Sequence, residues 1–246
     1  MVTATSPPLN CETVKINLLP GQAGLLTDFD SPILAAIAGT GGGKTHLGYW
    51  WLHSRMETYL GNTWLMAEPT YNMLEKIILV SSDAQRPSLP EYLRRIGHNP
   101  RWISKEHLIL GTDFGQIYFA SADKPDSMQG AAVRGVWLDE PGQMSVLAFD
   151  TGRQRCAMQS GLILLTSTPY NLGWLKTEVS DRASPTTGIH VEHWRSIDRP
   201  GFPRDRYEAE RRLLPPWRFA MMYDAQFDRP AGIIYAAFNE SVCVID

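Results

Sequence analysis

The stretch ILAAIAGTGGGKTHLGYWWL, residues 33–52, decides the fold of this chain. It begins with an apolar run typical of a buried strand, passes through four glycines among five residues, and ends in a segment compatible with a helix. Glycines let a backbone approach a phosphate closely, and the N-terminus of a helix favours negative charge. The order therefore predicts a strand, a phosphate-binding loop and a helix. The loop glycines are Gly39, Gly41, Gly42 and Gly43.

The two residues after these glycines supply the groups that a bound nucleotide needs. Lys44 can reach the β- and γ-phosphates, and the Thr45 hydroxyl can hold Mg2+. The pattern G-x-x-x-x-G-K-[ST] begins with glycine where this chain has Ala38, so the match covers the final glycine, lysine and hydroxyl positions. We predict that these residues, together with Thr40 and the loop glycines, bind a nucleotide.

A second apolar run, GVWLDE at residues 135–140, ends in two carboxylates. At the end of a strand Asp139 would join the Mg2+ shell, and Glu140 would act as a general base or orient the attacking water. Residues 139–142 also fit the D-x-x-G pattern of GTPases, but the chain has no N-K-x-D with which to read guanine. The pair therefore favours ATP as the nucleotide and Mg2+ as its metal.

A third apolar run ends in hydroxyl side chains at Thr166, Ser167 and Thr168. Ligands of open α/β sheets bind at the carboxyl ends of the strands. We expect these hydroxyls to sense the γ-phosphate and to couple its presence to the rest of the protein.

The chain alternates between predicted strands and helices, which favours an α/β fold with a mainly parallel sheet flanked by helices. Together with the phosphate loop and Glu140, this alternation predicts a P-loop NTPase of the class that carries a catalytic glutamate after a strand. Proline-rich turns beyond residue 171 indicate a small C-terminal lid or linker subdomain. We expect an ATPase core over residues 1–190 and the lid over 191–230. Strands are expected over 33–38, 63–67, 116–120, 136–138 and 162–166, helices over 45–59, 71–82, 90–96 and 205–214, and a hairpin over 102–115.

The composition excludes several classes of protein. With 246 residues, 43% hydrophobic and 20% charged, the chain can close a sizeable core and is not disordered. A net charge of −3 excludes attraction to nucleic acid by bulk charge, so any DNA contact must be local. Three scattered cysteines do not form a zinc pattern, and no apolar run approaches the about 20 residues that span a bilayer. The first residues lack a secretion signal, so we expect a cytoplasmic protein without membrane contact.

Taken together, these motifs resemble the N-terminal ATPase domain of large terminase subunits, the motors that package phage DNA. LLPGQ at residues 18–22 is similar to the adenine-contacting Q motif, which makes Gln22 a nucleotide-binding residue by resemblance. AEPTY at 67–71 resembles the second-strand motif, and residues 121–130 resemble the segment that leads to Walker B. TSTP at 166–169 is similar to the coupling motif.

GIIYAAF at 232–238 resembles the first strand of an RNase H-like nuclease domain, so residues 231–246 are expected to begin that domain and to end within it.

The resemblance implies an ATPase that drives double-stranded DNA into a procapsid in the host cytoplasm. It implies a portal and a small terminase subunit as partners, and a homo-oligomeric ring during packaging, although the isolated chain could be a monomer. Coupling would run from Thr166, Ser167 and Thr168 to the lid.

The family often carries arginines that this chain lacks: Thr40 and Gln129 stand in their places. Arg134 is the first candidate for a catalytic arginine finger because it is close to Asp139 in sequence, with Arg153 or Arg155 behind it. An arginine finger can act on the site of a neighbouring subunit.

Two other functions remain open at this stage. A P-loop kinase of a small molecule or nucleotide shares the phosphate loop, and a nucleotide-gated interaction module could bind ATP without hydrolysing it. The consecutive aromatic residues Tyr49, Trp50 and Trp51 are expected to pack in the core rather than to stack on bases.

Overall fold

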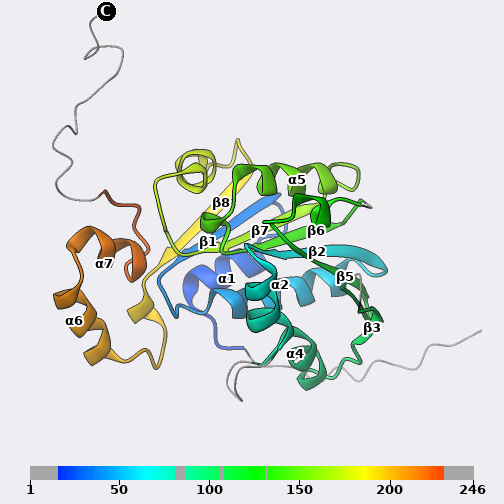
Figure 1. Ribbon diagram of the computed structural model, residues 1–246, viewed down its shortest axis with the longest axis horizontal. Helices are drawn as coiled ribbons and strands as arrows, with labels where there is room; N and C mark the ends of the chain where they lie inside the picture. Colours follow the sequence, from blue (N-terminus) through cyan, green and yellow to red (C-terminus); the bar gives the residue numbers. More distant parts are fainter. Residues whose placement is uncertain (1–15, 81–86, 106–107, 131, 230–246) are drawn as a thin grey trace, which may run out of the picture.

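The computed structural model describes residues 16–80, 87–105, 108–130 and 132–229. Its centre is an eight-stranded sheet in the order β3-β4-β5-β2-β6-β7-β1-β8 (Figure 1). From β5 to β8 in this order all strands run parallel, and β4 and β3 extend the sheet antiparallel. The strands are β1 (Ile33–Ala38), β2 (Asn62–Glu68), β3 (Arg101–Ser104), β4 (Ile109–Thr112), β5 (Gly115–Ser121), β6 (Gly135–Asp139), β7 (Leu162–Ser167) and β8 (Ile189–Trp194).

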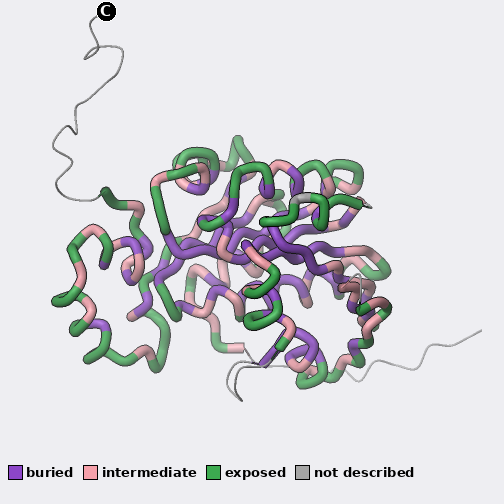
Figure 2. Tube along the Cα trace, viewed as in Figure 1, coloured by how far each residue is buried: buried purple, intermediate pink, exposed green. Residues whose placement is uncertain are grey.

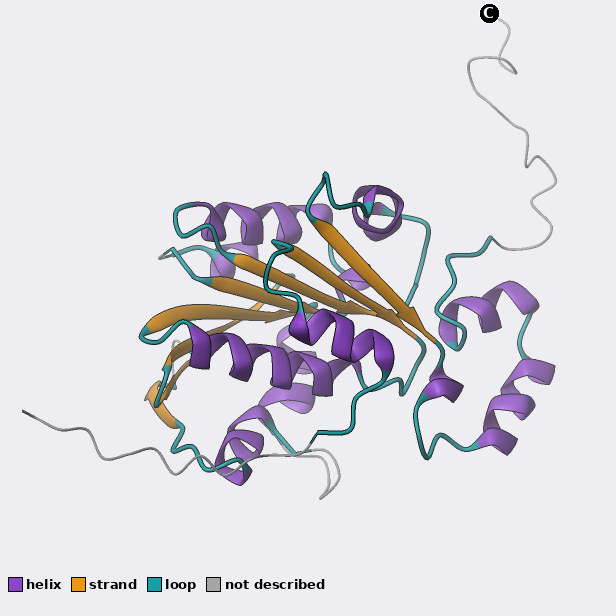
Figure 3. Cartoon of the chain, turned by 180° about the vertical axis from the view of Figure 1, so that it is seen from behind, coloured by secondary structure: helices purple, strands orange, loops and turns teal. Residues whose placement is uncertain are grey.

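Helices cover both faces of the sheet (Figures 1 and 3). On one face lie α1 (Pro20–Thr27), α2 (Lys44–Thr58) and α4 (Leu89–Arg95), and on the other lies α5 (Val146–Ala157). The remaining helices are α3 (Tyr71–Met73), which continues as a π-helix over Leu74–Leu79, a second π-helix over Leu175–Val179, α6 (Arg204–Leu213) and α7 (Pro216–Met222). Short 3-10 turns lie at Pro125–Met128, Pro141–Gln143, Ser180–Arg182 and Ser196–Asp198.

The sheet separates two hydrophobic clusters because successive side chains of a strand point to opposite faces. In β1, Leu34 and Ala36 belong to the cluster beneath α2, whereas Ala35 and Ile37 belong to the cluster beneath α5. Both faces of the central strands are therefore buried, as Figure 2 shows along the middle of the molecule. A strand buried on both faces reads as a continuous apolar run, which is the pattern seen in the sequence.

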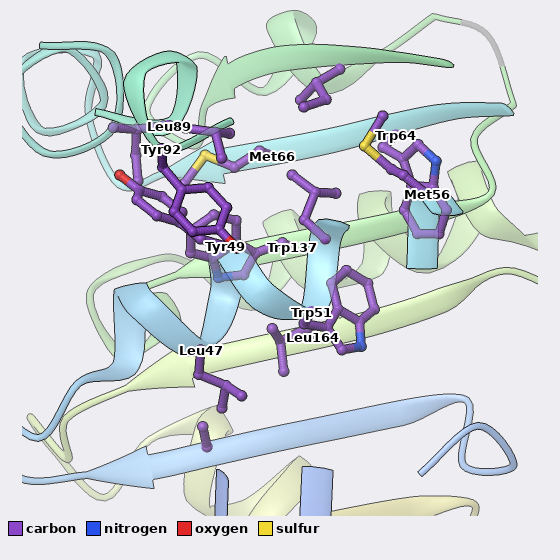
Figure 4. Packing of buried hydrophobic residues seen from close by; sticks show 14 of the residues in the cluster. Leu47, Tyr49, Trp51, Met56, Trp64, Met66, Leu89, Tyr92, Trp137 and Leu164 are labelled. Atoms are coloured by element: carbon purple, nitrogen blue, oxygen red, sulfur yellow. The ribbon is translucent and has the colours of Figure 1, made fainter. Parts of the chain in front are cut away.

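Large aromatic side chains fill the cluster beneath α2 (Figure 4). Trp51 of α2 meets Trp64 of β2 edge to face at 5.8 Å, and Tyr49 meets Trp137 of β6 in the same way at 5.8 Å. Tyr49 and Trp51 are buried, which confirms the expected core packing. Trp50 is half-buried and packs edge to face against Tyr92, so it belongs only partly to the core.

The predicted α/β fold with a mainly parallel sheet is confirmed. All five predicted strands are present, and β3, β4 and β5 form antiparallel pairs where the hairpin was expected. The helix expected over 71–82 continues as far as Leu79, and residues 81–86 lie outside the described residues.

The sequence patterns did not predict α1, α5, α7, β8 or the π-helix Leu175–Val179. The α5 helix buries Thr151 and Gly152 beside Ala148, so its inward face carries little hydrophobic signal. The β8 strand, IHVEHW, lies at the edge of the sheet and carries polar residues in its middle. As β8 pairs with β1, the sheet continues to Trp194, past the boundary expected at residue 190.

Beyond β8 the chain leaves the sheet and forms a small helical unit with its own core (Figure 1). Tyr207 of α6 packs against Phe219 and Tyr223, whose rings stack at 5.2 Å. We call residues 195–227, which include α6 and α7, the lid. The expected start of a further domain at 231–246 lies outside the described residues. No helix in the described part of the chain combines the length and the apolar character needed to cross a bilayer.

Candidate nucleotide-binding site

The glycine-rich loop, residues 39–43, joins the carboxyl end of β1 to the first residue of α2. Gly43 has a φ of +84° and Gly41 a φ of +72°. This left-handed backbone favours glycine because a Cβ would meet the neighbouring carbonyl oxygen. The turn lets α2 begin at Lys44, so the N-terminal peptide groups of the helix stand at the loop. Such a loop is suited to bind phosphate.

Lys44 is buried, with 7% of its surface exposed and its ammonium group at the centre of the site. Its Nζ donates to Thr168 Oγ1 at 2.7 Å and to the carbonyl oxygens of Ala38 and Gly39 at 3.3 and 3.4 Å. The same atom lies 3.6 Å from Glu140 Oε1. Lys44 thus links the glycine-rich loop to the Glu140 carboxylate and to the Thr168 hydroxyl.

Asp139 ends β6 and receives two hydroxyl hydrogen bonds. Thr45 Oγ1 donates to its Oδ2 at 3.0 Å, and Thr166 Oγ1 donates to its Oδ1 at 2.6 Å. Burial and the charge of Glu140 together raise the pKa of Asp139 to about 6, although the hydrogen bond from Thr166 opposes the rise. A hydroxyl and a carboxylate are the oxygen ligands that Mg2+ prefers, so the donor set fits this metal.

Glu140 follows Asp139 with a φ of +53°, a left-handed backbone that is uncommon for a residue with a side chain. Its Oε2 accepts from the Thr168 backbone N–H at 3.2 Å and from Ser167 Oγ at 3.5 Å. Burial and the charge of this carboxylate raise the pKa of the Tyr170 hydroxyl. Strained backbone of this kind persists where surrounding contacts hold it, and it concentrates at functional sites.

The three predicted coupling residues are all buried at the end of β7, and each contacts a different partner. Thr166 bonds Asp139, Ser167 accepts from the Gly142 N–H at 3.2 Å, and Thr168 bonds Lys44. The segment therefore touches the loop and both carboxylates at once.

Gln22 lies on α1 beside the loop. Its Oε1 accepts from the Leu19 N–H at 3.0 Å, and its Nε2 donates to the Gly43 carbonyl at 3.2 Å. It lines a cavity of about 230 Å³ between α1, α2 and the lid. Other lining residues are Leu18, Leu19, His46, Trp50 and Arg199.

The sequence suggests Arg134 as an arginine finger because it lies near Asp139 in the chain, but the structure places the two residues far apart. Arg134 precedes β6 and Asp139 ends it, so the two stand at opposite edges of the sheet, roughly 16 Å apart along the strand. Its guanidinium donates to the carbonyls of Gln159 and Ser160 and lies 3.9 Å from the Tyr59 ring centre. Residues at the two ends of a strand are not spatial neighbours, so Arg134 does not contact the Asp139 carboxylate of its own chain.

The other two arginine candidates lie on α5. Arg153 pairs with Asp150 at 3.8 Å and is 58% exposed, whereas Arg155 donates to the Gly130 carbonyl.

Sequence reasoning missed two residues of the site. Arg199 of the lid reaches the loop from 158 positions away, and no local pattern could have revealed it. Glu68 ends β2, next to Asp139 on the adjacent β6. A carboxylate directly after an apolar strand is the signal that identified Asp139, and it was available for Glu68 as well.

Glu68 is fully buried. Burial raises its pKa to about 11, and the charges of Asp139 and Glu140 contribute in the same direction. The folded protein thus holds this carboxyl protonated at neutral pH.

We expect Glu68→Gln to stabilise the nucleotide-free protein. An unfolded chain releases the Glu68 proton above a pH of about 4.5 whereas the folded chain keeps it, so stability falls as the pH rises above that value. Glutamine removes this loss, which amounts to at most about 3 kcal/mol at pH 7. Urea unfolding from pH 5 to 9 measures it.

The gain should shrink towards pH 5. Glu57→Gln, at an exposed position of α2, is the control and should change stability by less than about 0.5 kcal/mol. A gain for Glu68→Gln that is the same at every pH would contradict the assignment.

Solved structures of phage proteins share this fold. The large terminase from a thermophilic bacteriophage matches with a TM-score of 0.74 at 18% identity, over 90% of this chain and 56% of that chain. The complex of the same terminase with ADP matches with a TM-score of 0.71 at 19% identity, over the same shares of 90% and 56%. The large terminase ATPase domain of Thermus phage P74-26 matches with a TM-score of 0.68 at 18% identity, over 86% of this chain and 94% of that chain.

No protein-family model and no curated protein matches the sequence. The chain spans 56% of the length of the terminase from the thermophilic bacteriophage, and it covers nearly all of the P74-26 ATPase domain. At these low identities the similarity is one of fold. The glycine-rich loop, the strand order and the comparisons together lead to one conclusion: this chain has the P-loop fold of the large terminase ATPase domains.

Proposed function

We propose that the chain is the ATP-hydrolysing motor domain of a viral large terminase, which drives double-stranded DNA into a procapsid in the host cytoplasm. One observation carries the proposal: Lys44, Thr45, Asp139 and Glu140 meet at the carboxyl edge of the sheet. The terminase-like fold supports the class of motor, and the ADP-bound phage terminase supports a nucleotide as ligand.

The proposed roles follow from the contacts. Lys44 would bind the β- and γ-phosphates because its ammonium group stands at the loop. Thr45 and Asp139 would hold Mg2+, which neutralises charge on the phosphates when it is bound. Glu140 would orient the attacking water and accept its proton, since Ser167 and the Thr168 N–H fix its carboxylate.

Assembly would complete the site. As Arg134 lies at the opposite end of β6 from Asp139, a finger role for Arg134 requires that it reach the site of a neighbouring copy, with Arg153 or Arg155 as the alternatives. A homo-oligomeric ring supplies such neighbours, with a portal and a small terminase subunit as the other proposed partners. The lid would transmit the state of the nucleotide to DNA.

The test is steady-state phosphate release from ATP against protein concentration, with and without linear double-stranded DNA. Lys44→Ala is the blank, and Lys176→Ala, at a surface pair with Asp181, is the matched control. We expect ADP and free phosphate, turnover that rises faster than linearly with protein, and no release from the blank. A phosphorylated acceptor in place of free phosphate would identify a kinase. ATP binding without release would identify a non-hydrolysing module.

A further inference from the structure

Three successive carbonyl groups of the glycine-rich loop accept hydrogen bonds from the end of β8 and the lid. Trp194 Nε1, at the end of β8, donates to the Gly42 carbonyl at 2.8 Å. Just beyond it, Ser196 Oγ donates to the Thr40 carbonyl at 2.7 Å, and Arg199 Nη1 donates to the Gly41 carbonyl at 2.9 Å. The carbonyl side of the loop is therefore turned towards the lid segment.

The fit at the start of the loop is close. A Cβ on Gly39 would lie 2.4 Å from both Ser196 Oγ and the Tyr223 carbonyl oxygen, so only glycine fits there. The Thr40 N–H also donates to the Met222 carbonyl at 2.7 Å. These contacts hold the 3-10 turn Ser196–Asp198, and with it Arg199, against the loop.

Arg199 differs from its two neighbours in this set. Trp194 and Ser196 are buried, whereas Arg199 is exposed and lines the same cavity as Gln22, Gly43 and His46. Its guanidinium carries five N–H donors, and the Gly41 carbonyl uses Nη1. It thus lines the cavity beside Gln22 and Gly43 with donors left for a ligand.

The charge of the site calls for a second cation. The phosphate chain of ATP carries several negative charges, and Lys44, the cation that follows the loop, already lies 3.6 Å from the Glu140 carboxylate. A guanidinium binds phosphate oxygens in a bidentate fashion and keeps its charge at any physiological pH.

We infer that Arg199 binds the phosphate chain of the nucleotide, so that the lid supplies a second cation beside Lys44. The inference rests on the proposed ATP binding and adds a residue to it. It also gives the lid a direct contact with the nucleotide, in addition to its contacts with the loop backbone.

Three substitutions separate a phosphate contact from a simple latch. Arg199→Ala removes the charge and the donors, Arg199→Gln keeps an N–H donor for the Gly41 carbonyl but removes the charge, and Arg199→Lys keeps the charge. Binding of ADP and of ATP-γ-S with Mg2+ is measured by calorimetry. Arg204→Ala, at an exposed position of α6, is the control for the general positive field of the lid.

We expect Arg199→Ala and Arg199→Gln each to weaken nucleotide binding about tenfold, the usual effect of losing one charged hydrogen bond. Arg199→Lys should recover part of the loss, and Arg204→Ala should bind as the unchanged protein does. Unchanged thermal melting curves would show that the variants are folded.

Wild-type affinity in Arg199→Gln would overturn the inference, because the arginine would then only latch the lid to the loop. An equal loss in Arg204→Ala would overturn it too, since the field of the lid would explain both results. If the unchanged protein binds neither nucleotide, the proposed function itself fails, and this result is distinct from the other two.

Discussion

Replacing Glu140 with glutamine is expected to lower ATP turnover by about 10²–10⁴-fold, the usual contribution of a general base. Glutamine keeps the shape of the side chain and can still interact with Ser167 and the Thr168 N–H, but it cannot accept the proton of the attacking water. Binding of ATP should be retained or tighter, because the change removes a negative charge 3.6 Å from Lys44. Single-turnover phosphate release and equilibrium binding of ATP-γ-S measure the two effects separately.

Glu178→Gln is the matched control for Glu140→Gln, since Glu178 pairs with Arg182 on the surface. Its turnover should equal that of the unchanged protein. If Glu140→Gln hydrolyses ATP at nearly the normal rate, the water is activated by another group and the proposed role of Glu140 is wrong.

Replacing Trp137 with alanine is expected to destabilise the protein by about 3–5 kcal/mol, the range observed when a large aromatic side chain is removed from a core. Trp137 is fully buried and meets Tyr49 edge to face (Figure 4). Its Nε1 donates to Thr166 Oγ1 at 2.7 Å, and the same hydroxyl donates to Asp139. The core is thus hydrogen-bonded to the site. Urea unfolding followed by far-ultraviolet circular dichroism measures the loss.

Trp137→Phe separates packing from hydrogen bonding. It keeps most of the ring but leaves Thr166 without its donor, so the loss should be smaller, and combining it with Thr166→Val isolates the coupling between the two side chains. Met158→Ala, at a side chain 86% exposed, should change stability by less than about 0.5 kcal/mol. A loss of less than about 1 kcal/mol for Trp137→Ala would mean that the core adjusts around the cavity.

Most of the site could be predicted because each motif is local and ends a strand. Thr45 and Asp139 are 94 positions apart, yet their contact follows once the loop after β1 and the end of β6 are both placed at the carboxyl edge of the sheet. The same logic brings Thr168 to Lys44 across 124 positions. A parallel sheet aligns these strand ends at one edge, so a prediction of strands is in effect a prediction of the site.

The sequence by itself determined the glycine-rich loop, the two carboxylates, the hydroxyls of β7 and the α/β class, since short patterns encode strand ends and glycine turns. Only the tertiary structure decided which arginine stands near the cavity beside Gln22 and the glycine-rich loop. Arg134 lies at the opposite end of β6 from Asp139, whereas the path of the chain beyond β8 brings Arg199 to Gly41. The position of a long exposed side chain depends on how distant elements pack, and no local pattern records that packing.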